Sequence, residues 1–340
     1  MTGTARARAR RTIGGVGALA LALAVAACSG DAGDVAAQGD DPAPAAAPEP
    51  PPTWPFTGLP ADPSATTGPA FVVKIDNTAA SAPQRGLGSA DLVVEELVEG
   101  GTTRLAAFFH TELPDEVGPV RSMRASDIGI VPTDDTTVVT SGAAQRTITR
   151  LRDAGVGFVE EEGAPAGFSR SDARRIPYNL FADLTEVVGT PSDGERPDDY
   201  LAWGDGAAWA GGAPATEVDV RFSGSHTTSW ELDGDAYAVV DGNAGEGDDF
   251  RADTVVALEV DVVDAGYLDP AGNPVPESVL EGTGTATVFH AGRAVEATWS
   301  KASAAAPLRL LGADGAELAV PAGHTWIELV PATEGSVTYD

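Results

Sequence analysis

The chain has little cysteine, little lysine and little positive charge. Its 340 residues include one cysteine, Cys28, and two lysines, and 51 acidic residues against 21 basic ones give a formal net charge of −30. A single cysteine excludes an internal disulfide, so packing and hydrogen bonds must hold the fold. Nucleic acid is excluded as a partner, because binding it requires a basic surface that displaces phosphate counterions.

Familiar catalytic motifs are also missing. The sequence contains no G-x-S-x-G, S-x-x-K, G-x-x-x-x-G-K or H-E-x-x-H pattern. Its four histidines are widely spaced, and we expect packed or surface side chains rather than metal ligands. The acidic segment 241–252 resembles a calcium loop, but Glu246 replaces the turn glycine and Ala252 replaces the bidentate glutamate. We therefore predict no metal site and no cofactor.

The N-terminal segment has the pattern of a secretory signal peptide, residues 1–27, with arginines followed by an apolar run. Its end, Val25-Ala26-Ala27-Cys28, fits a bacterial lipobox, in which the chain is cut before Cys28 and acyl chains are attached there. The uncharged run 12–27 is shorter than the roughly 20 residues that span a bilayer. The sequence thus predicts an extracytoplasmic lipoprotein held on the bacterial cytoplasmic membrane through lipidated Cys28.

Composition divides the rest of the chain into three parts. Residues 28–53 are rich in Ala, Asp, Gly and Pro, which predicts a disordered tether. A Gly- and Pro-rich stretch near 190–215 separates residues 54–200, predicted as a mixed α/β domain, from residues 201–340, predicted as a mainly antiparallel β domain. The expected fold class is α+β.

Periodicity places the elements. Strands are predicted at 70–77 and 136–143, and a hairpin at 91–110 around Gly100-Gly101. Helical spacing favours helices at 143–155 and 178–189. In the second half, apolar residues alternate at every second position between Asp-Gly and Ala-Gly turns, which is typical of an antiparallel sheet, sandwich or partial barrel.

Arginines are the most suggestive polar residues. Residues 71–180 contain 11 basic and 16 acidic residues, whereas residues 181–340 contain 6 and 29. Arg121 and Arg124 follow the Gly118-Pro119 turn, and guanidinium groups match carboxylate and phosphate groups. From the residues alone two interpretations stay open: an anion-binding pocket, or internal ion pairs such as Arg121 with Asp127 or Glu99.

Several segments resemble the YerB-like family of bacterial lipoproteins, a two-domain family of uncharacterised function. They are "FTGLP", "VVKIDN", "PQRGLGSADLVVEELVEGGTTRLAAFF", "VGPVRSMRASDI", "RRIPYNLF", "DGNAGEGDDFRADTVVAL" and "GHTWIELVP". The resemblance implies that the following are family motif positions: Lys74, Asp76, Asn77, Glu95, Glu96, Glu99, Arg104, Arg121, Ser122, Arg124, Arg175 and Asn179. Tyr178 stands where the family commonly has histidine. With the family in view, a functional cleft becomes the favoured interpretation.

We therefore expect a lipoprotein that binds an anionic component of the cell envelope without requiring chemistry. The predicted ligand-binding residues are Lys74, Asn77, Arg104, Arg121, Ser122, Arg124, Arg175 and Asn179. One alternative is a hydrolase or transferase acting on cell-wall glycan or peptide, with general acid and base among Asp76, Glu95, Glu96 and Glu99. A second alternative is a protein–protein adaptor that uses the β-domain surface.

Overall fold

The computed structural model describes residues 51–62, 67–133, 135–162, 166–187, 196–206, 209 and 211–340. The predicted signal peptide, Cys28 and most of the predicted tether lie outside these residues. Residues from Pro50 to Asp340 form one compact unit. Within the described part of the chain, no helix is long and apolar enough to cross a membrane.

The first half of the chain builds one side of a large central sheet. Its strands are β1 (Ala70–Asp76), β2 (Leu92–Leu97), β3 (Thr103–Phe109), β4 (Thr136–Thr140) and β5 (Gly157–Glu160). The predicted β2–β3 hairpin is confirmed, and Gly100 and Gly101 both adopt positive φ in its turn, a conformation that favours glycine. β1 pairs antiparallel with β3 and parallel with β4.

The second half continues the same sheet. Its strands there are β14 (Thr254–Leu268), β16 (Gly282–His290), β17 (Arg293–Lys301), β18 (Arg309–Leu311) and β20 (Thr325–Pro331). The strand order is β18-β17-β16-β14-β20-β2-β3-β1-β4-β5, and β15 (Pro274–Val279) and β9 (Ala213–Pro214) add to β14 and β17. β20 runs parallel to both neighbours, β14 and β2. The sheet is therefore mixed, and it crosses the boundary predicted at residues 200/201.

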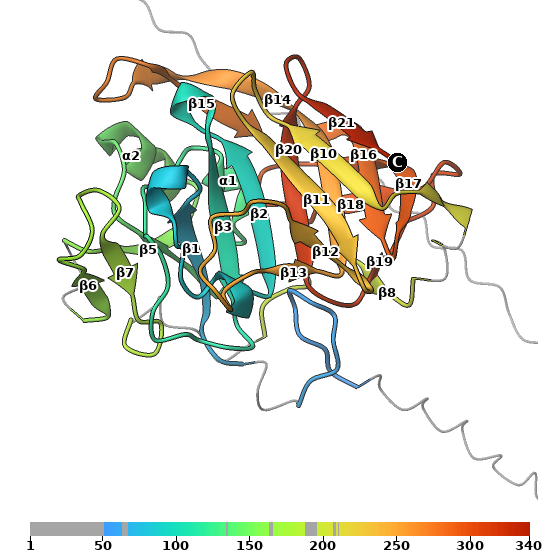
Figure 1. Cartoon of the computed structure of the whole chain (residues 1–340), viewed down its shortest axis with the longest axis horizontal. Helices are drawn as coiled ribbons and strands as arrows, with labels where there is room; N and C mark the ends of the chain where they lie inside the picture. Colours follow the sequence, from blue (N-terminus) through green and yellow to red (C-terminus); the bar gives the residue numbers. More distant parts are fainter. Residues whose placement is uncertain are drawn as a thin grey trace, which may run out of the picture. The chain divides into compact units, whose positions relative to one another are not determined.

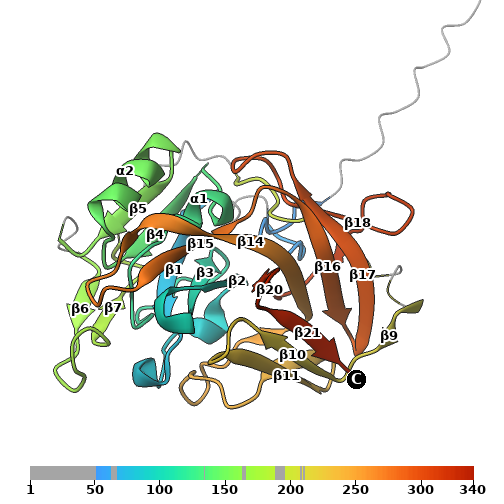
Figure 2. The same ribbon diagram turned by 90° about the horizontal axis from the view of Figure 1, so that it is seen from above.

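A smaller antiparallel sheet covers one face of the central sheet. Its order is β13 (Arg251–Ala252), β12 (Ala236–Val239), β11 (Thr227–Asp233), β10 (Glu217–Arg221) and β21 (Ser336–Tyr339). In Figure 2, β10, β11 and β21 form a second layer beside β20. Buried Val93, Phe109, Trp230, Tyr237 and Trp326 fill the space between the layers.

The helices are few and short, and the described fold is mainly β. The α-helices are α1 (Asp127–Ile130) and α2 (Gln145–Asp153), and α2 lies near β5 in Figure 1. Three short 3₁₀ turns lie at Ala79–Ser81, Leu87–Ser89 and Glu99–Gly101. Helix α2 confirms the prediction for 143–155, and Ile148 and Leu151 bury its apolar side.

The helix predicted at 178–189 is wrong. Leu180–Ala182 instead form β7, which pairs with β6 (Phe168–Arg170). The main chain of Val117 also bonds to that of Ala182, so this short apolar segment is held by long-range pairing that its helix-like spacing did not reveal. The remaining strand pair joins β8 (Trp203–Gly204) to β19 (Val320–Pro321).

Candidate functional site

The central sheet sorts the predicted site residues onto two opposite faces. Successive side chains of a strand point to opposite sides, so neighbours in sequence are separated in space. Lys74, Glu96 and Arg104 lie on the face that also bears Val94 and Ala106, whereas Glu95 lies on the face covered by the smaller sheet. Glu95 and Glu96 therefore cannot serve one site as a pair.

Lys74 is locked inside the protein. Its ammonium lies 2.8 Å from Glu96 Oε1 and 2.7 Å from Asp127 Oδ1, and all three side chains are inaccessible to solvent. Burial raises the pKa of Asp127, with a further contribution from neighbouring Glu96. An ammonium with two buried carboxylates and no solvent access has no room for a ligand, so Lys74 is a structural residue.

Arg121 and Arg124 also have internal partners. Arg121 Nε donates to Asp76 Oδ2 at 2.8 Å. Arg124 Nε and Nη2 donate to the two oxygens of Glu99, each at 2.8 Å, as a forked pair. Burial alone would raise the pKa of Glu99, but the hydrogen bond and charge of Arg124 outweigh it and lower that pKa. These contacts agree with the internal-pairing interpretation rather than with an open cleft.

Arg104 differs from the other cations of this face. It is 4% exposed, and its Nη1 donates to the Ser122 carbonyl at 2.8 Å, an oxygen that Arg124 Nη1 also approaches at 3.3 Å. Among the described residues, no carboxylate forms an ion pair with Arg104, and its buried Nε has no hydrogen-bond partner. Burial, with the charges of Arg124 and Arg121, lowers its pKa to about 9, so it stays protonated at neutral pH.

The last predicted motif lies at the edge of this cluster. Exposed Arg175 stacks over the Tyr178 ring at 5.4 Å, and Arg121 lies over the same ring at 5.6 Å. Asn179 instead accepts a hydrogen bond from Arg170. The cations thus converge only in part, around Arg104, Arg121, Arg124 and Arg175. The hydroxyl of Ser122 lies 3.3 Å from that of Ser141.

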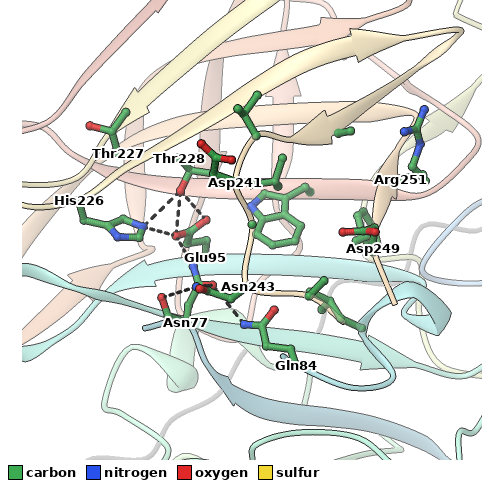
Figure 3. Close-up of a pocket in the computed structure, with 18 residues that line it drawn as sticks. Asn77, Gln84, Glu95, His226, Thr227, Thr228, Asp241, Asn243, Asp249 and Arg251 are labelled. Atoms are coloured by element: carbon green, nitrogen blue, oxygen red, sulfur yellow. Dashed lines mark hydrogen bonds and ion pairs between the residues drawn. The ribbon is translucent and has the colours of Figure 1, made fainter. Parts of the chain in front are cut away.

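The opposite face holds a pocket of about 370 Å³ between the two sheets. Its wall combines β2, the start of β11, the 240–251 loop and β20 (Figure 3). Ten of its 18 lining residues have polar or charged side chains. The lining residues are Asn77, Gln84, Leu87, Glu95, His226, Thr227, Thr228, Ala238, Val239, Val240, Asp241, Gly242, Asn243, Ala244, Asp249, Phe250, Arg251 and Trp326.

Glu95 is the fully buried carboxylate of this pocket. Asn77 Nδ2 donates to its Oε1 at 3.0 Å, His226 Nε2 lies 3.0 Å from the same oxygen, and the Thr228 hydroxyl lies 3.1 Å from each oxygen. Figure 3 shows these side chains gathered around Glu95. Burial alone would raise the pKa of Glu95, but the hydrogen bond and charge of His226 outweigh it and lower that pKa. Glu95 is therefore ionised.

Glu328 is the carboxyl opposite Glu95 on the neighbouring strand β20. It is buried, and its Oε1 accepts a hydrogen bond from Trp230 Nε1 at 2.8 Å. Burial and the negative charge of Glu95 raise the pKa of Glu328 well above its usual range, so it is protonated. Two adjacent carboxyl groups thus share one negative charge, and it resides on Glu95.

Most of this pocket was not predicted from the sequence. Asn77 was predicted as a ligand-binding residue together with the arginines, Glu95 as a candidate general acid or base, and His226 as a packed or surface side chain. Two signals were available: Glu95 and Glu328 are acidic residues within the apolar runs "LVVEELV" and "TWIELV". A buried carboxylate requires partners, but nothing in the sequence states that these two strands are neighbours.

Comparison with known proteins identifies the class. Residues 56–194 match the N-terminal domain, and residues 218–327 the C-terminal domain, of the family described as "Protein of unknown function (DUF3048)". The chain belongs to this family. The resemblance to YerB-like lipoproteins noted from the motifs is confirmed.

A particular relative is the Bacillus subtilis (strain 168) protein named "Putative lipoprotein YerB". It is 26% identical over 295 residues, which cover 82% of this chain and 86% of the relative. The crystal structure of YerB protein from Bacillus subtilis matches with a TM-score of 0.68 and 21% identity, covering 84% of this chain and 99% of that one. At that identity the structural likeness shows the shared fold.

Proposed function

We propose that this protein is a lipid-anchored lipoprotein outside the cytoplasmic membrane that binds a small polar molecule of the cell envelope in the Glu95 pocket. The observation that carries the proposal is a pocket of about 370 Å³ with an ionised carboxylate buried in its wall. That volume lies within the range of small-molecule sites, and a few convergent polar groups on a partly apolar wall are typical of such sites.

The lining favours a ligand rich in hydrogen-bonding groups. Asn77 and Asn243 bring partly exposed amide groups, and Trp326 and Phe250 contribute apolar surface. Asp241 and Asp249 add negative charge, whereas Arg251 is paired with Asp233 at 2.9 Å. This balance supports a neutral or cationic ligand, which differs from the anionic ligand expected from the sequence.

Binding is better supported than catalysis. The alternative of a hydrolase or transferase placed the general acid and base among Asp76, Glu95, Glu96 and Glu99. Glu95 and Glu96 face opposite sides of the sheet, and Glu96, Asp76 and Glu99 are each ion-paired with a lysine or an arginine. Glu328 is next to Glu95 but does not line the pocket.

Ligand capture tests the proposal. The full-length protein is incubated with the small-molecule fraction of a bacterial envelope extract, washed and denatured, and the released molecules are identified by mass spectrometry. Val240→Trp adds bulk at an exposed position of the pocket wall, and Arg104→Met serves as a control on the opposite face. We expect retention by wild type and Arg104→Met and loss in Val240→Trp. Equal retention by a folded Val240→Trp variant would refute the proposal.

Anchoring through Cys28 has a separate test. Cys28→Ala removes the only thiol that can be lipidated. We expect wild type to sediment with membranes and the variant to appear in the soluble extracytoplasmic fraction. Membrane association that survives this substitution would exclude the lipid anchor without affecting the pocket.

The arginine cluster supports a second candidate function, anion binding. The specific observation in its favour is that Arg104 is protonated and buried, and that no carboxylate among the described residues forms an ion pair with it. Titration with inorganic phosphate is the test: saturable binding that weakens in Arg104→Met, and also weakens with salt, supports it. Phosphate binding that is unchanged in Arg104→Met would refute it.

A further inference from the structure

Lys301, the last residue of β17, is a buried amine with an unusual surrounding. It is 7% exposed, and its Nζ donates a hydrogen bond to the main-chain carbonyl of Ala306. Among the described residues, no carboxylate forms an ion pair with this amine. Because a buried charge without a counterion is unfavourable, ion pairing does not explain why a lysine occupies this position.

The other lysine of the chain has a different environment. The sequence contains two lysines, Lys74 and Lys301, and the remaining positively charged residues are arginines. Lys74 is held by two carboxylates. A lysine amine can lose its proton and act as a nucleophile, whereas a guanidinium group stays protonated in proteins. Lys301 therefore brings a chemical property that no arginine of this chain provides.

Lys301 lies in the wall of a second cavity, which we call the Lys301 cavity and which has a volume of about 80 Å³. Residues 129–133, 198–200 and 304–308 form the rest of its wall. Most of these side chains are apolar, and the Tyr200 hydroxyl is bonded to the Ile130 carbonyl. One water molecule takes up about 30 Å³ in the liquid, so the cavity accommodates a molecule of a few non-hydrogen atoms.

The surroundings of Lys301 favour its neutral form. Burial lowers the pKa of its amine to about 8, although the negative charge of Glu281 acts in the opposite direction. Two wall carboxylates, Asp198 and Asp199, are exposed, and Asp199 is paired with Arg196. At pH 7.5 the neutral form of such an amine is on the order of 100-fold more abundant than that of an exposed lysine. A neutral lysine in an apolar pocket is an activated nucleophile.

We propose that Lys301 binds a small aldehyde or ketone in the Lys301 cavity as a Schiff base. The amine nitrogen attacks the carbonyl carbon, a C=N bond replaces the C=O bond, and the oxygen leaves as water with both amine protons. An anion is disfavoured, because Lys301 is the one basic side chain among the described lining residues and Asp198 and Asp199 add negative charge. This site is separate from the Glu95 pocket and goes beyond the proposed function.

Reductive trapping with propanal tests the proposal. The full-length protein is incubated at pH 7.5 with propanal and sodium cyanoborohydride, which reduces the imine to a stable amine, and the labelled peptides are identified by mass spectrometry. Nα-acetyl-lysine amide in the same solution is the exposed reference amine. Lys74, which is inaccessible to solvent, is the internal negative control.

Labelling of Lys301 should be fast, saturable and dependent on pH. We expect its rate to exceed that of the reference amine by about 10-fold or more, to saturate with propanal, and to be half-maximal near pH 8. We expect no label on Lys74, because its amine is enclosed by Glu96 and Asp127.

Three variants make the test specific. Lys301→Arg keeps the positive charge but removes the amine, and we expect no label at position 301. Ala304→Leu adds bulk to the cavity wall, and we expect labelling of Lys301 to slow by about 10-fold, because the carbonyl can no longer be placed against the amine. Ala302→Leu adds the same bulk at an exposed position outside the wall, and we expect a rate within about twofold of wild type.

The proposal is overturned if Lys301 is labelled no faster than the reference amine, or if a folded Ala304→Leu variant is labelled as fast as wild type. Either result would make Lys301 an ordinary surface amine. Neither would affect the proposed function, because retention of an envelope molecule is tested by Val240→Trp in the other pocket.

Discussion

The two faces of the central sheet bury charged side chains with different kinds of partner. On one face Lys74 and Arg121 form ion pairs with carboxylates, and the Lys74 pair is inaccessible to solvent. On the other face Glu95 accepts hydrogen bonds from Asn77 and Thr228 and contacts His226 in the wall of a pocket. The difference between the two faces shows that many charged residues in one part of a sequence do not by themselves indicate a binding site.

The largest loss of stability is expected where the ion pairs are most deeply buried. Lys74→Met leaves Glu96 and Asp127 without their shared cation, and we expect the free energy of unfolding to fall by about 3–5 kcal/mol. Chemical denaturation measures it. Adding Glu96→Gln and Asp127→Asn should recover much of the loss, because no uncompensated charge then remains. A single variant within about 1 kcal/mol of wild type would contradict a structural role for Lys74.

A smaller loss of stability is expected at the forked ion pair between Arg124 and Glu99. Arg124→Met removes both hydrogen bonds to Glu99 and should cost about 1–3 kcal/mol at neutral pH. The pKa of Glu99 is lowered from 4.5 in the folded protein, so this stabilisation is complete above pH 4.5 and is lost as the pH falls through the lowered folded-state pKa. The difference between wild type and variant should therefore shrink on acidification. A difference that is constant across that range would contradict the pairing.

On the pocket face, the stability of the protein should depend on pH in the opposite direction. The pKa of Glu328 is raised well above 4.5 in the folded protein, so the folded state binds more protons than the unfolded state. Stability of the wild type should then fall as the pH rises from 4.5 towards the folded-state pKa. Glu328→Gln removes this fall and should stabilise the protein at pH 7 by about 1–2 kcal/mol. Destabilisation at pH 7 with an unchanged pH profile would show that Glu328 is ionised.

The smallest effect is expected at the protein surface. Arg150 and Glu277 form a forked pair with 38% and 16% of their side chains exposed. Arg150→Gln should change the free energy of unfolding by less than about 1 kcal/mol, because solvent screens exposed pairs. It is a control for the two buried-pair variants. A loss of unfolding free energy as large as that in Arg124→Met would show that burial does not determine how much each ion pair contributes to stability.

Local patterns in the sequence predicted the local structure well. Runs of apolar and β-branched residues located β1 and the β2–β3 hairpin, and Gly155 marked the end of α2. Predictions failed where long-range pairing decided the outcome, as at Leu180–Ala182. The parallel arrangement of β20 between β14 and β2 was likewise absent from the expected antiparallel pattern, because a period of two defines the faces of a strand but not its neighbours.

The site was predicted less completely than the fold. Arg121 and Arg124 lie near Arg104, as expected, but their carboxylate partners Asp76 and Glu99 could not be assigned from one sequence. His226 and Glu328 approach Glu95 from positions 131 and 233 residues further along the chain. No spacing rule connects such positions. Glu328 lies beside Glu95 because β20 and β2 are neighbours in the central sheet, and His226 reaches Glu95 because the smaller sheet packs on that face.

The most direct test of this account is a crystal structure of the full-length protein with the molecule that it retains from the envelope extract. We expect electron density in the pocket between the two sheets, in contact with the polar side chains of its wall such as Asn77. Density beside Arg104 and Arg121, with the pocket unchanged, would contradict it.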